Sequence, residues 1–263
     1  MDTKTISYTV DQEGIAILTL SRPQALNALT AQMCQELYDV LKDVNHSDNV
    51  RALLLTGEGR AFCTGLDIAE LKEGYDTHES FYRHLEAANQ LIVRLSELHK
   101  PLVMAVNGVA AASGMNMILT ADIAVASDQA TFSQSFGNVG LIPDVGGTYF
   151  LPRIVGVPRA KEIIFMDRKL NAQEALDLGI VHQLVPPAQV VDVAYAMAQK
   201  LSSGPSFAFS VAKKMLSCCN EMDIHTALHM EALSQALVSN VDDYKEGIDA
   251  FIEKRTPVFD RNR

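Results

Sequence analysis

The sequence predicts an α/β fold that is followed by a helical C-terminal region, and three observations support this prediction. Short apolar runs alternate with amphipathic helical patterns up to about residue 155. Such apolar runs are typical of strands that are buried on both faces of a sheet. Beyond Pro187, only helical patterns follow. We therefore expect a core over residues 1–195 and a helical oligomerisation region over residues 196–263.

The expected strands begin with a hairpin. Residues 6–10 and 15–20 are β-type runs on either side of the turn-prone Asp11-Gln12-Glu13-Gly14. Three short apolar runs and one later β-type run predict the other strands. They are residues 52–55, 102–106, 123–126 and 180–185.

The expected helices have recognisable caps. Thr30 is a suitable N-cap for a helix with apolar residues at helical spacing. Those residues are Met33, Leu37, Val40, Leu41 and Val44. A long helix is expected at 79–98, and a short one starts at the Asn171 cap and ends at Gly179. The C-terminal helices are expected at 194–201, 206–216, 225–238 and 243–255.

Composition excludes several classes of protein. A hydrophobic fraction of 48% over 263 residues excludes a disordered chain. A net charge of −10 without basic runs excludes a general nucleic-acid binder. The four cysteines have no ligand spacing, so neither a zinc site nor a disulfide framework is indicated. We expect a cytoplasmic protein, because no apolar stretch approaches the roughly 18–20 residues that span a bilayer and no secretory signal is visible.

Two segments share one design, in which a strand leads into a turn of small residues and the start of a helix. They are residues 60–71 and 105–118. Amides at a helix start lack intrahelical acceptors, and two of them that converge on one carbonyl oxygen form an oxyanion hole. Taken singly, each segment is more often an ordinary tight turn.

Together with their surroundings, these segments resemble the crotonase family, which is also called the enoyl-CoA hydratase/isomerase superfamily. The matching segments are 21–29, 59–68, 100–117, 139–156, 169–185 and 244–259, in family order. The resemblance implies a crotonase-like spiral of ββα units and C-terminal helices that build homotrimers or dimers of trimers. It also implies an acyl-CoA thioester substrate, with coenzyme A as part of the substrate and no separate cofactor, metal, nucleic acid or membrane partner.

By position, the resemblance assigns the oxyanion-hole donors to the backbone amides of Leu66 and Ser113. The two glutamates with which family hydratases activate water fall at Asn116 and Phe136. An amide and a phenyl ring cannot exchange a proton at neutral pH, which disfavours ordinary hydration. We expect both side chains to line the acyl pocket instead.

Asp144 is the candidate acid–base residue, within Ile142-Pro143-Asp144-Val145-Gly146-Gly147. An aspartate in such a setting is usually a turn former. However, family isomerases carry an aspartate at this position, and the surrounding sequence looks most like the 1,2-epoxyphenylacetyl-CoA isomerase branch. An apolar wall that includes Phe136 would raise the pKa of this carboxyl.

Matched positions also suggest contacts with coenzyme A, whose phosphates need local cations in an acidic protein. They are Arg22, Ala25, Leu26, Ala61, Asp67, Ile68, Ala69 and Lys254. The last would act across a subunit boundary, although a solvated helix end explains Lys254 equally well. Asp67, Glu70 and Asp122 are more simply explained as structural or capping groups.

The leading hypothesis is therefore an enoyl-CoA isomerase that acts through an enolate, with Asp144 moving the proton. One alternative is an enoyl-CoA hydratase of fatty-acid β-oxidation that uses Asp144 or Glu70. Another is a non-catalytic oligomer that binds acyl-CoA. A serine hydrolase built on Ser113 is disfavoured, because no histidine lies in a partner motif. The acyl group, the pathway and the choice between trimer and hexamer stay open.

Overall fold

The computed structural model describes residues 3–74 and 77–259, and its centre is a six-stranded sheet. In sheet order, the strands are β1 (Ile6–Val10), β2 (Ile15–Leu20), β3 (Ala52–Gly57), β5 (Leu102–Val106), β7 (Ile123–Ser127) and β10 (Gln183–Val185). Strands β1 and β2 form the predicted antiparallel hairpin, and every other pairing in this sheet is parallel. The predicted strand at 180–185 is shorter than expected and begins only at Gln183.

A second sheet of four short strands was not predicted. Its strands are β4 (Ala61–Cys63), β6 (Val109–Ala111), β8 (Thr131–Ser133) and β9 (Leu170–Asn171). Strands β3, β5 and β7 each lead within a few residues into β4, β6 and β8 respectively, and helices follow. These helices include α2 (Ile68–Gly74), α4 (Ser113–Ile118) and, after the turn η2 (Gly137–Val139), α5 (Gly147–Val155). The repeated unit confirms the expected spiral of ββα units.

The core depends on the alternation of side chains along the strands of the first sheet. In β3, Leu53 and Leu55 join the cluster that includes α1 (Ala31–His46) and α3 (His78–Ser96). Leu54 points to the other face, where α8 (Val190–Ser202) covers it. All three leucines are fully buried, each worth about 1.5–3 kcal/mol of transfer free energy. Burial on both faces explains why these strands are wholly apolar.

The predicted helix caps are confirmed. Thr30 accepts a hydrogen bond from the Met33 amide at 3.1 Å, and all five predicted apolar positions of α1 are buried. Asn171 and Glu174 form a reciprocal capping box at α7 (Ala172–Asp177). The helices α5 and α6 (Val157–Phe165) were not predicted. Within the described ranges, no helix has the length and apolarity needed to cross a membrane.

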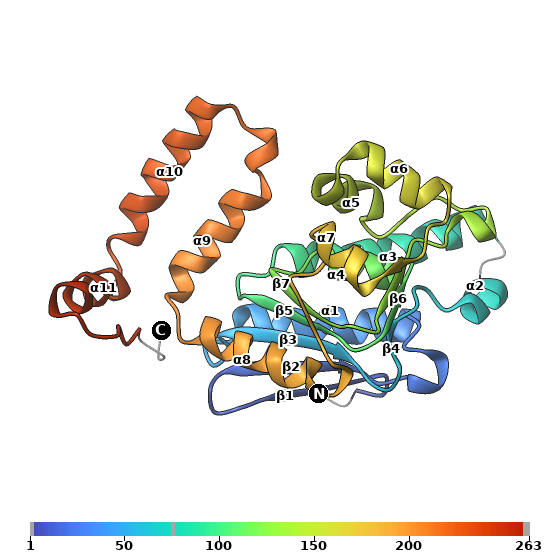
Figure 1. Cartoon of the computed structure of the whole chain (residues 1–263), viewed down its shortest axis with the longest axis horizontal. Coiled ribbons are helices and arrows are strands. Elements are labelled where there is room, and N and C mark those ends of the chain that lie inside the picture. The colour runs from blue at the N-terminus through green and yellow to red at the C-terminus, as the bar shows by residue number, and fades with distance from the viewer. Residues whose placement is uncertain (1–2, 75–76, 260–263) are drawn as a thin grey trace.

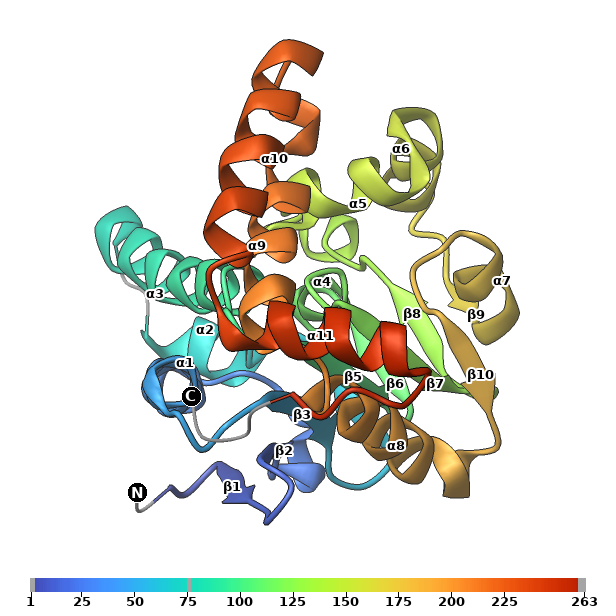
Figure 2. The same cartoon turned by 90° about the vertical axis from the view of Figure 1, so that its left-hand side faces the viewer.

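The C-terminal helices differ from the core in burial. They are α9 (Ser206–Ser217), α10 (Ile224–Val238) and α11 (Asp242–Glu253). Figure 1 shows them leading away from the two sheets, and in Figure 2, which is viewed from that side, they lie in front. None of the residues of α9 or α10 is buried, and Leu228, Leu233 and Leu237 are each more than half exposed. The predicted division after residue 195 falls within α8 and stays a prediction.

Short 3-10 turns complete the chain. They are η1 (Pro23–Ala25), η3 (Pro187–Gln189) and η4 (Cys219–Glu221), in addition to η2. The first of them shapes the loop between β2 and α1, which adjoins the site described next.

Candidate active site

Two segments of the spiral meet at the candidate site. We call residues 65–69 the Leu66 arm and residues 112–116 the Ser113 arm. Gly65 has φ +91°, and a Cβ atom placed there would lie 2.8 Å from Ala112 Cβ and 3.3 Å from the Ser113 nitrogen. The backbones of the two arms are therefore in contact, as the predicted oxyanion hole requires.

The Ser113 arm is buried and closely packed. Ser113 and Asn116 are fully buried, and Ser113 is the first residue of α4, where an amide has no intrahelical acceptor. The preceding Ala112 has φ +48° and ψ −126°, a strained conformation for a residue with a side chain. A methyl group at Gly114 would overlap the Cys63 carbonyl oxygen, so the close approach of α4 to β4 needs a residue without a side chain at this position.

The Leu66 arm is held by an isolated parallel bridge to Leu29. The Leu29 amide donates to the Gly65 carbonyl at 2.8 Å, and the Asp67 amide donates to the Leu29 carbonyl at 2.9 Å. In a parallel bridge, the residue between these two partners directs its own amide to the opposite side. The Leu66 amide therefore points away from Leu29, and it belongs to the segment that adjoins Ser113.

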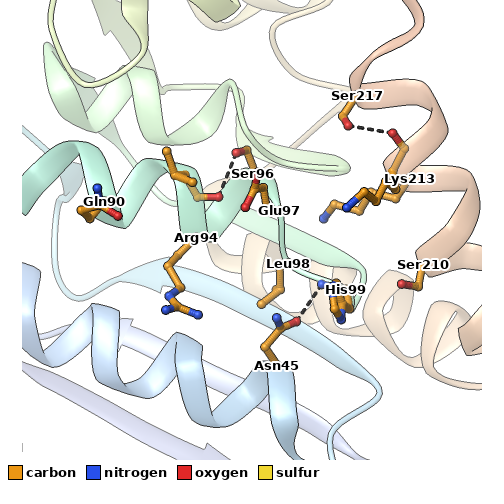
Figure 3. Close-up of a pocket in the computed structure, with 12 residues that line it drawn as sticks. Asn45, Gln90, Arg94, Ser96, Glu97, Leu98, His99, Ser210, Lys213 and Ser217 are labelled. Carbon is orange, nitrogen blue, oxygen red and sulfur yellow. Dashed lines mark hydrogen bonds between the residues drawn. The ribbon is translucent and has the colours of Figure 1, made fainter.

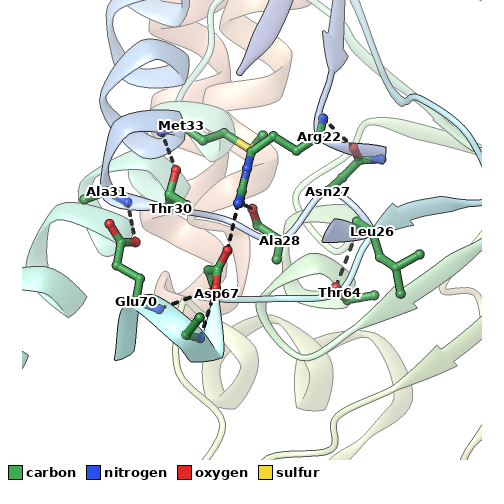
Figure 4. Close-up of polar contacts among 11 residues, drawn as sticks. Arg22, Leu26, Asn27, Ala28, Thr30, Ala31, Met33, Thr64, Asp67 and Glu70 are labelled. Carbon is green, nitrogen blue, oxygen red and sulfur yellow. Dashed lines mark hydrogen bonds and ion pairs between the residues drawn. The ribbon is translucent and has the colours of Figure 1, made fainter. Parts of the chain in front are cut away.

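An ion pair secures the start of α2 (Figure 4). Arg22 Nη2 lies 2.9 Å from Asp67 Oδ2, and Arg22 Nη1 donates to the Ala28 carbonyl at 2.6 Å. Asp67 Oδ1 accepts from the Ala69 amide at 3.0 Å and so caps α2. Burial would raise the pKa of Asp67, but the Arg22 guanidinium and the capping amides hold it below its usual value. The expected structural role of Asp67 is confirmed.

The other residues predicted to contact coenzyme A differ in burial, and they do not all lie together. Ala25 and Leu26 are half-buried, and the Leu26 carbonyl accepts from the Thr64 hydroxyl just before the Leu66 arm. Ile68 and Ala69 are exposed at the end of this arm. Ala61 is buried. Lys254 is exposed at the end of α11, and Figure 1 places α11 and α2 toward opposite ends of the longest axis. Within one chain, Lys254 therefore does not join the other positions.

Asn27 is a residue that the sequence analysis missed. It is fully buried, and its Nδ2 donates to the carbonyls of Glu58 at 2.9 Å and Ala61 at 2.8 Å. Its Oδ1 accepts from the Arg22 amide at 2.9 Å. This one side chain thus joins the loop before α1 to the strand that leads into the Leu66 arm. Its φ of +57°, which asparagine tolerates better than most residues, follows no pattern visible in the sequence.

Glu70 and Asp122 bind backbone groups, as expected for structural carboxylates. Glu70 accepts from the Ala31 amide at 2.8 Å. Asp122 accepts from the Leu102 amide at 2.7 Å and from Lys213 Nζ at 2.6 Å.

Asp144 lies against the Ser113 arm. The Ser113 hydroxyl donates to Asp144 Oδ1 at 3.0 Å. Burial raises the pKa of the Asp144 carboxyl to about 6, although the Ser113 hydroxyl and the residue's own amide act in the opposite direction. Such a carboxyl is mostly ionised at pH 7 and is well matched to accepting and returning a proton.

The two positions that lack a glutamate have different surroundings. Asn116 Nδ2 donates to the Asp144 carbonyl at 2.8 Å, and Asn116 Oδ1 accepts from Gln134 Nε2 at 2.9 Å. Gln134 is buried, and its partnership with Asn116 was not visible in the sequence. Phe136 is only 5% exposed and immediately precedes η2, and its carbonyl accepts from the Val139 and Leu141 amides. Asn116 thus supports Asp144 directly.

A separate hollow of about 300 Å³ lies between the end of α3 and α9 (Figure 3). Asn45, Arg94, His99 and Lys213 are among its lining residues, and Lys213 is paired with Asp122. None of the predicted site residues lines this hollow. Over the described ranges, no cluster of three or more potential metal ligands is found.

Comparison with known proteins agrees with this geometry. A family model described as enoyl-CoA hydratase/isomerase matches residues 10–262. The 1,2-epoxyphenylacetyl-CoA isomerase of Escherichia coli is 36% identical, covering 94% of this chain and 95% of the relative. A probable enoyl-CoA hydratase of Rhodobacter capsulatus is 38% identical, covering 98% and 99%. The crystal structure of an enoyl-CoA hydratase from Bacillus anthracis is 33% identical with a TM-score of 0.93, covering 97% and 99%.

Proposed function

Because the chain belongs to the enoyl-CoA hydratase/isomerase family, we propose that it is an enoyl-CoA isomerase with Asp144 as its single acid–base residue. One observation carries the proposal: a half-buried carboxyl, hydrogen-bonded to Ser113 at 3.0 Å, lies against the Ser113 arm, which itself contacts the Leu66 arm. The positions of the hydratase glutamates hold Asn116 and Phe136 instead.

The reaction needs only one carboxylate. Asp144 removes a proton from C2 or C4 of an unsaturated acyl chain, and the electron pair moves onto the thioester oxygen. The Leu66 and Ser113 amides hold this oxygen as a dienolate. Protonated Asp144 then returns its proton to the other carbon, so that the double bond moves and no atom is gained or lost. General acid–base catalysis contributes about 10²–10⁴-fold, and each oxyanion donor about 10²–10³-fold.

Hydration is the alternative that the relatives keep open, because the Rhodobacter capsulatus relative is named as a probable hydratase. A hydratase must both hold a water and return a proton. In this chain, Asn116 Nδ2 and Oδ1 are already engaged by the Asp144 carbonyl and by Gln134. That engagement favours the isomerase.

The decisive experiment uses 3-hexenoyl-CoA in D₂O, followed by proton NMR, with the wild type and with Asp144→Ala. We expect a conjugated 2-enoyl product, which contains deuterium wherever the proton on Asp144 exchanges with the solvent before it is returned. We expect the variant to form no such product. A 3-hydroxyacyl product would replace the isomerase proposal with the hydratase. Coenzyme A binding without turnover on a panel of enoyl and ring-epoxide thioesters would instead support a non-catalytic binder.

The proposal includes a homotrimer or a dimer of trimers, in which Lys254 reaches the coenzyme A of a neighbouring subunit. The uncovered leucines of α10 support such packing, because exposed apolar patches commonly mark interfaces. Light scattering should give a mass three or six times that of the chain. In the assembled protein, Lys254→Ala should raise KM for the coenzyme A thioester and leave kcat unchanged.

A further inference from the structure

Ser113 has a side chain at a position where the family resemblance leads us to expect glycine, and that side chain is engaged. Its hydroxyl donates to Asp144 Oδ1 at 3.0 Å, and the residue has no exposed surface. We propose that Ser113 has a second role as a positioning residue, whose hydroxyl orients the Asp144 carboxylate and keeps it ionised. This inference rests on the proposed role of Asp144 as the acid–base residue.

The chemistry of the contact suits proton transfer in both directions. A serine hydroxyl can donate one hydrogen bond, and Ser113 donates it to Oδ1 of Asp144. Oδ1 can accept that hydrogen bond whether or not a proton sits on Oδ2. The carboxyl can therefore take a substrate proton on Oδ2 and return it from the same atom without rotating. In the first half, a bond from carbon to hydrogen breaks as the bond from Oδ2 to hydrogen forms. In the second half, the bond from Oδ2 to hydrogen breaks as a bond from hydrogen to the other carbon forms.

The main chain of Asp144 is held by the same helix. Ser113 and Asn116 are three residues apart on α4 and therefore share a face. Ser113 holds the carboxylate, while Asn116 Nδ2 donates to the Asp144 carbonyl at 2.8 Å. A Cβ atom at Gly147 would lie 2.5 Å from Asn116 Nδ2, so the turn after Asp144 is closely packed against Asn116. One face of α4 therefore holds both the side-chain carboxylate and the main-chain carbonyl of Asp144.

The charged side chains on the surrounding elements do not take over the role of the Ser113 hydroxyl as a partner of the Asp144 carboxylate. On α3, His84 lies near Glu70, and Arg94 donates to Tyr38. On α5, Arg153 pairs with Glu221. Tyr149 on α5 donates to Glu221, burial raises the pKa of the Cys63 thiol to about 12, and Asp167 accepts from the Ser135 amide. Among the described residues, no cation forms an ion pair with Asp144.

The balance of effects on Asp144 gives the sign of the expected change. Burial favours the neutral carboxyl, and the Ser113 hydroxyl favours the ionised one. Removing the hydroxyl therefore raises the pKa of Asp144 further. From the usual strength of a hydrogen bond to a charged group, the rise is about one pKa unit, or a tenfold change in the ionisation constant.

The test measures the pKa of Asp144 directly by titrating carbon-13-labelled aspartate carboxyl signals, assigned with Asp144→Asn. We expect Ser113→Ala to raise that pKa by about one unit. The acidic limb of kcat/KM should move to higher pH by the same amount, and Ser113→Thr should restore both values. Ser113→Gly serves as a second variant if the alanine variant does not fold.

Ser127→Ala is the matched control, because Ser127 is also buried and its hydroxyl oxygen accepts from the amide of Gln129, two residues along the chain. It should leave the Asp144 titration unchanged. An unchanged titration in Ser113→Ala would overturn the positioning role while leaving the isomerase proposal intact. If Asp144→Asn still exchanges substrate protons, the isomerase proposal fails, and the carboxyl titration remains a separate measurement of the Ser113 contact.

Discussion

The two arms of the candidate oxyanion hole are held in position by different physical interactions. The Ser113 arm is buried from Ser113 to Asn116 and fixed by packing, with a close approach at Gly114 that leaves no space for a methyl group. The Leu66 arm is partly exposed and fixed by polar contacts, chiefly the ion pair between Arg22 and Asp67. The contrast teaches that one donor is preorganised by excluded volume, while the other depends on charges that salt and pH can weaken.

The largest loss of activity is expected from Gly114→Ala, because this substitution disturbs the packing of the Ser113 arm. The added methyl group would meet the Cys63 carbonyl, so α4 and β4 must move apart and the two donors lose their spacing. We expect isomerase activity to fall by about 10²-fold or more, which is the order of effect of one lost donor. Steady-state kinetics and thermal unfolding measure the two consequences.

Gly247→Ala is the control for this prediction, because a Cβ atom there meets only Phe259 at an ordinary 3.7 Å. It should leave activity unchanged. Full activity in Gly114→Ala would mean that the close approach does not set the donor geometry.

Arg22→Ala removes the ion pair that holds the Leu66 arm, and we expect it to cause a smaller loss of activity. Without the guanidinium, Asp67 and the Ala28 carbonyl lose their partner, and the start of α2 loosens. We expect kcat/KM to fall by about tenfold, as for a lost hydrogen bond to a charged group. In the wild type, added salt should reproduce part of this effect.

A truncated thioester that lacks the coenzyme A phosphates separates two roles for Arg22. If Arg22 holds the arm, the loss persists with the truncated substrate. If Arg22 only binds a phosphate, as the sequence resemblance suggests, the loss disappears.

The smallest expected effects are on stability, and they have opposite signs for Asp144, which lies against the Ser113 arm, and for Asp67 of the Leu66 arm. The pKa of Asp144 in the folded protein, about 6, lies above its ordinary value of 3.8. Folding stability is therefore lost as pH rises from 3.8 to 6, by roughly 1–3 kcal/mol in total. Asp144→Asn should raise the midpoint of thermal unfolding at pH 8, and the gain should shrink toward pH 4.

Asp67 provides the contrast. Its pKa is lowered in the folded protein, so its stabilisation is present above its ordinary value of 3.8 and is lost as pH falls through the lower, folded value. Asp67→Asn should therefore lower the unfolding midpoint at pH 8. If both variants changed stability in the same direction, the distinction between a buried charge and a paired charge would be wrong.

Sequence patterns predicted the elements that carry strong local signals. The hairpin, the wholly buried strands and the Thr30 cap each follow from periodicity or capping chemistry. The second sheet could not be predicted in the same way, because strands of two or three residues, such as β4 and β9, are too short to show any alternation. Their pairing depends on contacts between distant units.

The candidate site shows the same contrast between features that the sequence indicates locally and features that depend on contacts between distant segments. Family position predicted Asp144, Leu66 and Ser113, but the partners of these residues come from tertiary structure. Nothing in the sequence connects Asn116 with the Asp144 carbonyl, or Asn27 with the Glu58 and Ala61 carbonyls, because each hydrogen bond joins segments 28–34 residues apart. Such contacts become visible only when the chain is folded.

The close approach of Gly114 to the Cys63 carbonyl has a consequence for how this protein can evolve. The contact is made by backbone atoms, so substitutions of the side chains around the acyl pocket do not act on it directly. New substrates can therefore be accommodated by changing pocket residues, while the separation of the two arms stays the same. Diversification of substrate choice would thereby be uncoupled from the spacing of the two candidate oxyanion-hole donors.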